Sequence, residues 1–161
     1  MRNDDIISSI RYMLDLPDGG VAEILTLGGY TPKRGDVEAI FKRPKPTVTR
    51  IDGSTAEEDT PDDLTAHFLD GLIIYRRGKS DDHPPQPIET PVTNNTVLKK
   101  LRVALELKEK EMLEMIQQGG VTLSASEFRA FFRDRMHRNY RPAGDQVLRY
   151  FLKAATEKLR G

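Results

Sequence analysis

The stretch NDDIISSIRYMLDL (residues 3–16) decides the fold, because it recurs in the same chain as NNTVLKKLRVALEL (residues 94–107). A shift of 91 residues aligns the two stretches without a gap, and their apolar positions coincide. In the first stretch these positions are 6, 7, 10, 13 and 14, which is the spacing of one face of a helix. The repeat therefore predicts that one helical unit occurs twice in the chain.

The same alignment continues into a second helix in each copy. These helices are expected at about 21–27 and 109–118, and both run into a Gly-Gly pair. Glycine adopts the left-handed backbone that ends a helix without a steric penalty from a Cβ atom. Each pair is therefore predicted to stop its helix. A phosphate-binding loop is the less favoured interpretation, because neither pair has the spacing of such a loop and no strand is expected before it.

The third helices are expected at about 32–42, with Thr31 as the cap, and at about 125–134, where Ser124 and Glu127 have the spacing of a capping box.

The first helices, 4–16 and 95–107, also begin after polar residues that can cap them. The candidates are Asn3 in the first copy, and Thr93 or Asn94 in the second.

A fourth helix is expected at about 62–77 and at about 143–160. Here the alignment needs a shift of 83 residues, which places Asp62 on Asp145. Both aspartates are expected to be first-turn or capping residues. The first copy thus carries about eight extra residues in KPTVTRIDGSTAEEDT (45–60). This insertion is rich in turn formers and has no periodic apolar face, so it is predicted to be a loop, and no strand is expected in the chain.

These observations predict an all-α fold of two tandem copies of a four-helix module, packed with pseudo-twofold symmetry. The expected modules are residues 1–78, with the loop insertion at about 44–61, and residues 94–161, joined by a Pro-rich linker at 79–93. Each module offers only a small core, so the two copies are expected to cover each other's apolar faces.

Three strings in the chain resemble the YehS-like family of bacterial proteins. They are FLDGLIIYRRGK from Phe68, NNTVLKKLRVALELK from Asn94 and GDQVLRYFLKA from Gly144. That family is a duplicated domain of unknown function, so the resemblance supports the duplication and implies a bacterial, cytoplasmic source. It carries over no catalytic residue.

Composition narrows the possible functions. Lysine and arginine number 25 and so do aspartate and glutamate, so no global charge excess draws the chain to nucleic acid or to an anionic membrane. The absence of cysteine excludes disulfides and thiolate chemistry. The longest apolar run is only 72–75, and the first residues do not form a secretory signal. The chain is therefore expected to be a soluble, cytoplasmic protein without membrane contact.

No catalytic, cofactor or metal site is expected from the sequence. The three histidines, His67, His83 and His137, have no metal-ligand spacing, and no serine lies in a nucleophile motif. His83 is interpreted as a solvated linker residue, and the other two as helix-surface or helix-end residues. The chain is thus predicted not to be an enzyme.

A basic segment of the second module is the candidate surface for nucleic acid or another anion, because arginine and lysine neutralise phosphates and interleaved tyrosines stack on bases. The candidate residues are Lys99, Lys100, Arg102, Arg129, Arg133, Arg138, Arg141 and Arg149. The simpler alternative is a solvated face whose cations pair with nearby glutamates such as Glu109 and Glu127.

The leading functional hypothesis is a non-enzymatic protein-interaction or adaptor protein. It would bind a protein partner, or a second copy of itself, in a groove between the copies or on an exposed fourth helix. Nucleic-acid binding or regulation through the Arg-rich surface is the alternative.

Overall fold

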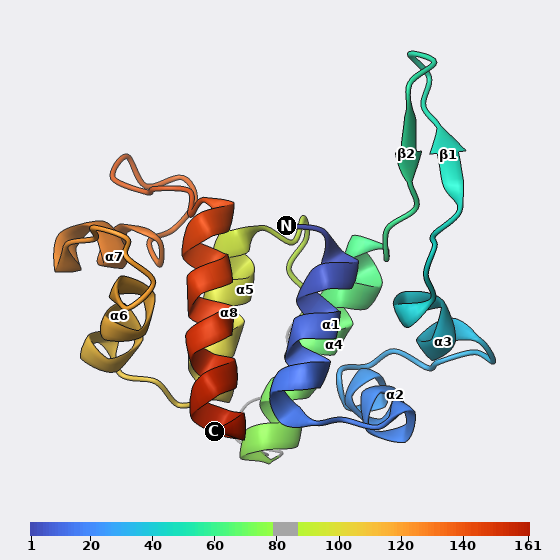
Figure 1. Ribbon diagram of the computed structural model, residues 1–161, viewed down its shortest axis with the longest axis horizontal. Coiled ribbons are helices and arrows are strands. Elements are labelled where there is room, and N and C mark those ends of the chain that lie inside the picture. Colours follow the sequence, from blue (N-terminus) through green and yellow to red (C-terminus); the bar gives the residue numbers. More distant parts are fainter. Residues whose placement is uncertain (79–86) are drawn as a thin grey trace.

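The computed structural model describes residues 1–78 and 87–161, and over these residues the protein is mostly helical (Figure 1). The elements are α1 (Asn3–Leu14), α2 (Asp18–Leu27), α3 (Asp36–Phe41), β1 (Thr47–Thr49), β2 (Thr55–Glu57), α4 (Asp62–Arg77), α5 (Asn94–Ala104), α6 (Glu109–Gln117), α7 (Ala125–Ala130) and α8 (Asp145–Arg160).

Four long helices, α1, α4, α5 and α8, form the centre of the molecule, and the shorter helices lie outside them (Figure 1). All four central helices run in the same direction. Contacts at both ends show this: Met1 meets Asp145 where α1 and α8 begin, and Arg160 lies 3.5 Å from Asp15 where both helices end. Likewise, the backbone N–H of Val92 reaches Asp62 where α4 begins, and Arg77 meets Glu106 beyond the end of α5.

The packing joins each half of the chain to the other half. Helix α1 packs on α8 and helix α5 packs on α4, so the first helix of each half lies against the last helix of the other. Within each half, α2 covers α4 and α6 covers α8. The buried apolar side chains of both halves form one continuous core. The core is therefore shared between the halves, as expected from their small size.

The ends of the first helices follow the sequence repeat closely. Asp15 and Glu106 are separated by the same 91 residues, and both have a left-handed backbone, with φ of 52° and 55°. The predicted caps are confirmed at Thr93, which forms a capping box with Thr96, and at Ser124, which forms one with Glu127. The cap predicted at Asn3 is wrong, because α1 begins at that residue and its side chain bonds elsewhere.

The third helices are shorter than the sequence pattern indicates. Helix α3 begins at Asp36, so the prediction of a start near Pro32 with Thr31 as cap is wrong. A turn held by one carboxylate replaces the first part of the expected helix: Asp36 accepts hydrogen bonds from the backbone N–H of Lys33 and from the hydroxyl of Tyr30. Helix α7 ends at Ala130, before the expected end at Asp134.

The insertion contains a β-hairpin, which corrects the expectation that the chain has no strand. Strands β1 and β2 pair antiparallel, with Val48 opposite Ala56, and the chain turns at Asp52 and Gly53. The hairpin projects from the helical body (Figure 1), and both of its strands are largely exposed to solvent. Strands without a buried face have no reason to alternate apolar and polar residues, so the sequence carried no periodic signal for them.

The two glycines of each Gly-Gly pair have different roles. Gly29 and Gly120 have positive φ angles of 92° and 98°, as expected for residues that end a helix. Gly28 has an ordinary φ of −79°, but a Cβ atom there would lie 1.8 Å from the carbonyl oxygen of His67. Gly71 faces the same crossing from α4, where a Cβ atom would lie 1.8 Å from the carbonyl oxygen of Ile24. Glycine thus lets the backbones of α2 and α4 come into direct contact.

This crossing gives a first testable prediction. Gly71→Ala should lower the free energy of unfolding by about 2 to 3 kcal/mol, because the new methyl group meets backbone atoms that cannot rotate away. Urea denaturation followed by circular dichroism measures the change. Gly19→Ala in α2 is the control: no atom lies within 4 Å of its new Cβ, so it should be neutral or stabilising by about 0.5 kcal/mol. Equal effects of the two variants would contradict the close approach.

Candidate functional site

Two equivalent asparagine–aspartate pairs hold the ends at which the central helices begin. The side-chain amide of Asn3 donates to Asp62 at 2.7 Å and to the carbonyl oxygen of Thr60 at 2.8 Å. In the second half, the amide of Asn94 donates to Asp145 at 2.8 Å and to the carbonyl oxygen of Ala143 at 3.0 Å. The same pair of bonds therefore fixes the first helix of each half to the start of its own last helix.

Each of these aspartates also binds a residue outside its own half of the chain. Asp62 accepts a hydrogen bond from the backbone N–H of Val92 at 2.9 Å, and Asp145 lies 2.8 Å from the amine nitrogen of Met1. The hydrogen bond from Asn94, followed by the bond and charge of the Met1 amine, holds the pKa of Asp145 below its usual value. Both aspartates are first-turn residues, as expected, but their carboxylates join the halves and make no cap hydrogen bond.

One buried position differs between the halves in its charge. Asn95 is buried in the second half: its oxygen accepts the N–H of Ala143 and its amide group donates to the carbonyl oxygens of Phe131 and Arg141. Asp4 takes this position in the first half, is fully buried, and accepts the backbone N–H and the hydroxyl of Thr60.

A carboxylate cannot donate, so a lysine from the insertion supplies the missing donor. Lys45 precedes the hairpin, lies 3.4 Å from Asp4 and donates to the carbonyl oxygen of Ala39 in α3. Burial by itself would raise the pKa of Asp4, but the hydroxyl of Thr60 and the charge of Lys45 bring it below its ordinary value of 3.8. This cluster anchors the hairpin, and every polar group named in it is already paired.

A groove of about 850 Å³ lies between α1 and α8. The side from α1 contributes small and aromatic residues, and the side from α8 contributes mostly charged ones. The lining residues are Met1, Ser8, Ser9, Tyr12, Arg149, Leu152, Lys153, Thr156, Glu157, Arg160 and Gly161. The side chain of Tyr12 is 61% exposed, and the guanidinium of Arg160 lies over its ring at 4.2 Å. The groove has an apolar floor at Leu152 and a basic rim.

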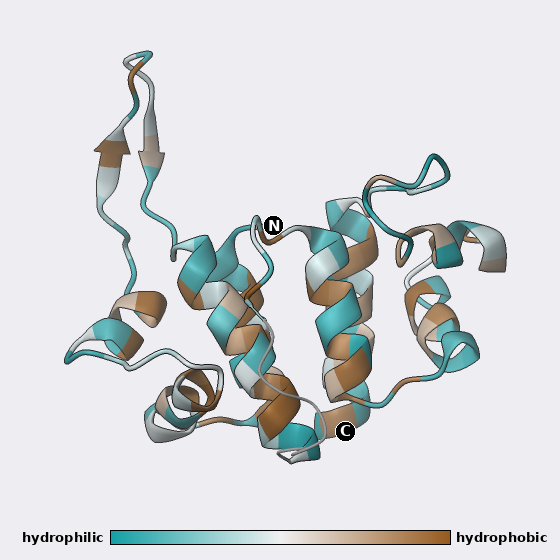
Figure 2. Cartoon of the chain, turned by 180° about the vertical axis from the view of Figure 1, so that it is seen from behind, coloured by the Kyte–Doolittle hydropathy of each residue, from teal (hydrophilic) through white to brown (hydrophobic). Residues whose placement is uncertain are grey.

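The equivalent face of the molecule, between α4 and α5, is covered by the chain itself. Residues 87–92 lie over these two helices, as the view from behind shows (Figure 2). Glu89 in this segment binds Lys99 at 3.0 Å and Lys100 at 3.4 Å, and Lys100 also binds Asp70 of α4 at 2.8 Å. Over the α1–α8 face, no other segment of the described chain crosses the two helices (Figure 1). One of two equivalent faces is thus covered and the other is open.

The candidate basic residues are for the most part paired with nearby acids or aromatic rings. Arg129 binds Glu109 at 2.7 Å, and Arg141 binds Glu127. The remaining candidates on helices are held at separate places: Lys99 and Lys100 by Glu89, Arg102 against the ring of Phe132, and Arg149 beside Asp145 in the α1–α8 groove.

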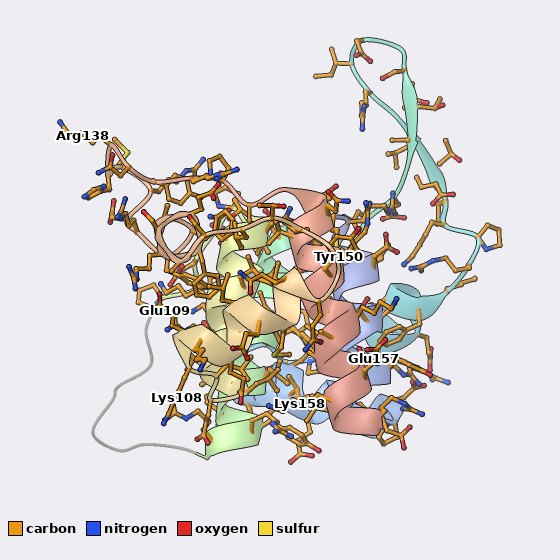
Figure 3. All side chains as sticks on the ribbon, turned by 60° about the vertical axis from the view of Figure 1, so that its left-hand side comes forward. Lys108, Glu109, Arg138, Tyr150, Glu157 and Lys158 are labelled. Atoms are coloured by element: carbon orange, nitrogen blue, oxygen red, sulfur yellow. The ribbon has the colours of Figure 1, made fainter. Side chains whose placement is uncertain are left out.

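The loop between α7 and α8 holds the two other candidates. Arg133 donates to the carbonyl oxygen of Asn139, and Arg138 lies at the far end of the loop, pointing away from the helices (Figure 3). Lys99 and Arg133 do come together around a cavity of about 640 Å³, with Arg135 and Tyr140, but Glu89 and Asp134 line the same cavity. The structure therefore brings together only part of the candidate surface and mixes it with acids.

Among the described residues, the histidines and acids form no reactive centre. His67 bonds to the carbonyl oxygen of Gly28 at the α2–α4 crossing, and Nδ1 of His137 accepts the backbone N–H of Asn139. His83 and residues 79–86 of the predicted linker lie outside the described residues. Within the described part of the chain, no three histidine or acidic side chains gather as a metal site. No helix there is long and apolar enough to span a membrane.

Sequence reasoning did not single out most of the groove residues. Serines such as Ser8 and Ser9 are typical of caps and loops, but both lie within α1, and no sequence motif includes Tyr12. A signal was present in the repeat itself, because Ser8 and Ser9 align with Lys99 and Lys100, and a change from serine to lysine at equivalent exposed positions indicates different surroundings. What the sequence could not show is that residues 87–92 lie over one of the two faces.

Comparison with known proteins identifies the family. The model of a family described as "Protein of unknown function (DUF1456)" matches residues 3–78 and again residues 94–161. The chain belongs to the DUF1456 family. It is 35% identical over 153 residues to the uncharacterized protein YehS of Escherichia coli (strain K12), a match that covers 95% of this chain and 93% of YehS. The YehS-like resemblance is thereby confirmed. No solved structure matches this DUF1456 protein.

The buried charge of the DUF1456 chain gives a second prediction. Asp4→Asn should lower the free energy of unfolding at pH 7 by about 3 kcal/mol, because it leaves Lys45 buried without its counter-ion. The pKa of Asp4 is depressed in the folded state. Its stabilising effect is therefore present above the ordinary value of 3.8 and is lost as the pH falls through the folded value. The difference in the free energy of unfolding between wild type and Asp4→Asn should therefore become smaller below about pH 4.

Asn95→Asp is the reciprocal control. It places a carboxylate against the carbonyl oxygens of Phe131 and Arg141 with no lysine nearby. The variant should therefore have a lower free energy of unfolding than wild type at pH 7, and this loss should become smaller as the pH falls and the carboxylate is protonated. Denaturant titrations at pH 7, 5 and 3.5 measure both variants. A wild-type advantage over Asp4→Asn that stays constant across this range would contradict the assignment.

Proposed function

We propose that this DUF1456 protein is a non-enzymatic interaction module whose α1–α8 groove binds an extended segment of a partner protein. The observation that supports this most directly is the state of the equivalent face, where residues 87–92 of the chain lie across α4 and α5 and Glu89 binds two lysines. Since one face accepts an extended segment, the other can accept one too, because the helices that build the two faces correspond in the sequence repeat.

We also propose that the two halves are four-helix modules related by a pseudo-twofold axis along the central helices. The support comes from contacts that recur with the shifts of the sequence repeat. The Asn3–Asp62 bond corresponds to Asn94–Asp145, and the Arg77–Glu106 ion pair corresponds to Arg160–Asp15. The packing of α1 on α8 corresponds to that of α5 on α4. The module limits 1–78 and 94–161 stay predictions.

Nucleic-acid binding is the second candidate, and the contacts of the basic residues favour it less. A phosphate contact requires a cation that can leave its present partner, and most of the candidate residues have an acid within ion-pair distance. Arg135 and Arg138, in the loop after α7, form no ion pair with a described residue, so nucleic-acid binding would depend on them.

The absence of catalysis is proposed on similar grounds. The groove is lined by Ser8, Ser9, Lys153 and Glu157, but none of these side chains is held by a neighbour in the manner of an activated nucleophile or a positioned base. The geometry offers a surface for binding and supports no particular reaction.

Site-directed photo-crosslinking in cells tests the interaction proposal. A benzophenone amino acid at Tyr12 lies in the open groove, and the same group at Val103 occupies the equivalent position on the covered face. We expect a discrete protein adduct at Tyr12 that is lost when Ser9→Trp fills the groove, and no corresponding adduct at Val103. The crosslinked segment, identified by mass spectrometry, should bind the purified protein as a synthetic peptide.

Other results would overturn the proposal. Adducts that contain only nucleic acid would favour the second candidate, and adducts with a second copy of the chain would make the groove a self-association surface. Adducts that survive Ser9→Trp would show that the groove is not the binding site.

Separate expression of the two halves tests the proposed modules. Residues 1–78 and 94–161 should each fail to unfold cooperatively, because α1 and α5 each lose the helix on which they pack. Mixing the two fragments should restore the helical circular dichroism signal and one cooperative transition. A fragment that unfolds alone with the stability of the whole chain would contradict the shared core.

A further inference from the structure

We infer that the segment bound in the α1–α8 groove is acidic: a glutamate or aspartate binds Lys153 and Arg149, and a neighbouring apolar side chain covers Leu152. This inference rests on the proposed function and adds the chemistry of the partner. It follows from three features of the groove, which are the arrangement of its covered counterpart, its charge and its apolar floor.

The covered face shows what kind of segment this architecture accepts. Glu89 binds Lys99 and Lys100, and Ile88 immediately before it is half-buried. The segment is thus held on α5 through its carboxylate, while Ile88 lines the neighbouring cavity together with Thr96 and Phe132. Burial and the hydrogen bonds and charges of the two lysines act in opposite directions on Glu89, and the lysines prevail, so its pKa lies below the usual value.

The charges at equivalent positions differ between the two faces. On the covered face the cations come from α5, as Lys99 and Lys100, and α4 contributes the acid Asp70. On the open face α1 contributes Ser8 and Ser9, and α8 carries Lys153 at the position equivalent to Asp70. The cation that would bind a carboxylate is therefore still present, but it comes from the other helix.

The cations of the open groove are only partly satisfied within the described chain. Arg160 lies 3.5 Å from Asp15, whereas Arg149 lies 3.9 Å from Asp145, which already binds Asn94 and the Met1 amine. Lys153 forms no ion pair with any described residue. Glu157 is the one acid among the lining side chains. A carboxylate from outside would complete this set, as Glu89 does on the other face.

The size and floor of the groove fit the same kind of segment. Ser8 and Ser9 are small, which leaves space where lysine side chains stand in the counterpart. Leu152 forms the floor, and the ring of Tyr12 provides an exposed apolar wall. An apolar side chain adjacent to the carboxylate would be buried there against Leu152.

Selection of peptides from a random twelve-residue phage library tests the inference without assuming a partner. The full-length protein is immobilised, and Ser9→Trp serves as the variant with a filled groove. Ser54→Trp, at an exposed serine of the hairpin turn, is the control variant with an open groove. We expect enriched peptides that contain an acidic residue next to an apolar one. They should bind wild type and Ser54→Trp equally and bind Ser9→Trp at least ten-fold more weakly.

The possible results distinguish the inference of an acidic segment from the proposed interaction function. Enriched peptides that depend on the open groove but are neutral or basic would overturn the acidic inference and leave the interaction function in place. Enrichment that is the same for wild type and Ser9→Trp, or no enrichment at all, would overturn both.

Charge reversal provides a second test with the selected peptide, measured by fluorescence anisotropy. Lys153→Glu should weaken binding at least ten-fold, and a peptide whose acid is replaced by lysine should regain most of the lost affinity on this variant. Lys99→Glu, which changes the covered face, should leave the affinity of the acidic peptide within two-fold of wild type. Unchanged binding to Lys153→Glu would overturn the inference.

Discussion

The structure depends on the exchange of helices between the two halves of the chain. Each first helix packs on the last helix of the other half, and the aspartate at the start of each last helix is bonded to both halves at once. Because α1 and α5 bury apolar side chains against their exchanged partners, neither half has a complete core of its own. The positions of the α1–α8 and α4–α5 faces follow from this exchange.

The sequence predicted the helical repeat well, since apolar spacing and capping residues are local signals. The pattern at Ile6, Ile7 and Ile10, the capping box at Ser124 and the limits of α4 agree with the structure. Of the two caps expected for α5, the structure has Thr93. The errors lie where a tertiary contact replaced a local one. The side chain of Asn3 bonds to Asp62 at the start of α4 and does not cap its own helix. The hairpin has no buried face, so its sequence has no alternating apolar pattern.

The candidate site was harder to predict for the same reason. Counting arginines located basic residues but not the acids that the fold brings beside them, such as Glu109 beside Arg129. The open groove depends on two helices that are distant in sequence and on the path of residues 87–92, and neither is a local property. Only the contrast of Ser8 and Ser9 with Lys99 and Lys100 is visible in the sequence. It can be interpreted only when the structure of both faces is known.

The parallel course of the central helices has an electrostatic consequence. The peptide dipoles of α1, α4, α5 and α8 add to one another, so their starts share a partial positive charge and their ends a partial negative one. The side chains oppose this polarity: first turns carry acids such as Asp5, Asp63 and Asp145, and last turns carry bases such as Arg76, Arg102 and Lys158. The formal charges of the chain sum to zero, but they are not evenly distributed along the central helices. Acidic side chains lie near the helix starts and basic ones near the helix ends, where they compensate the field of the backbone dipoles.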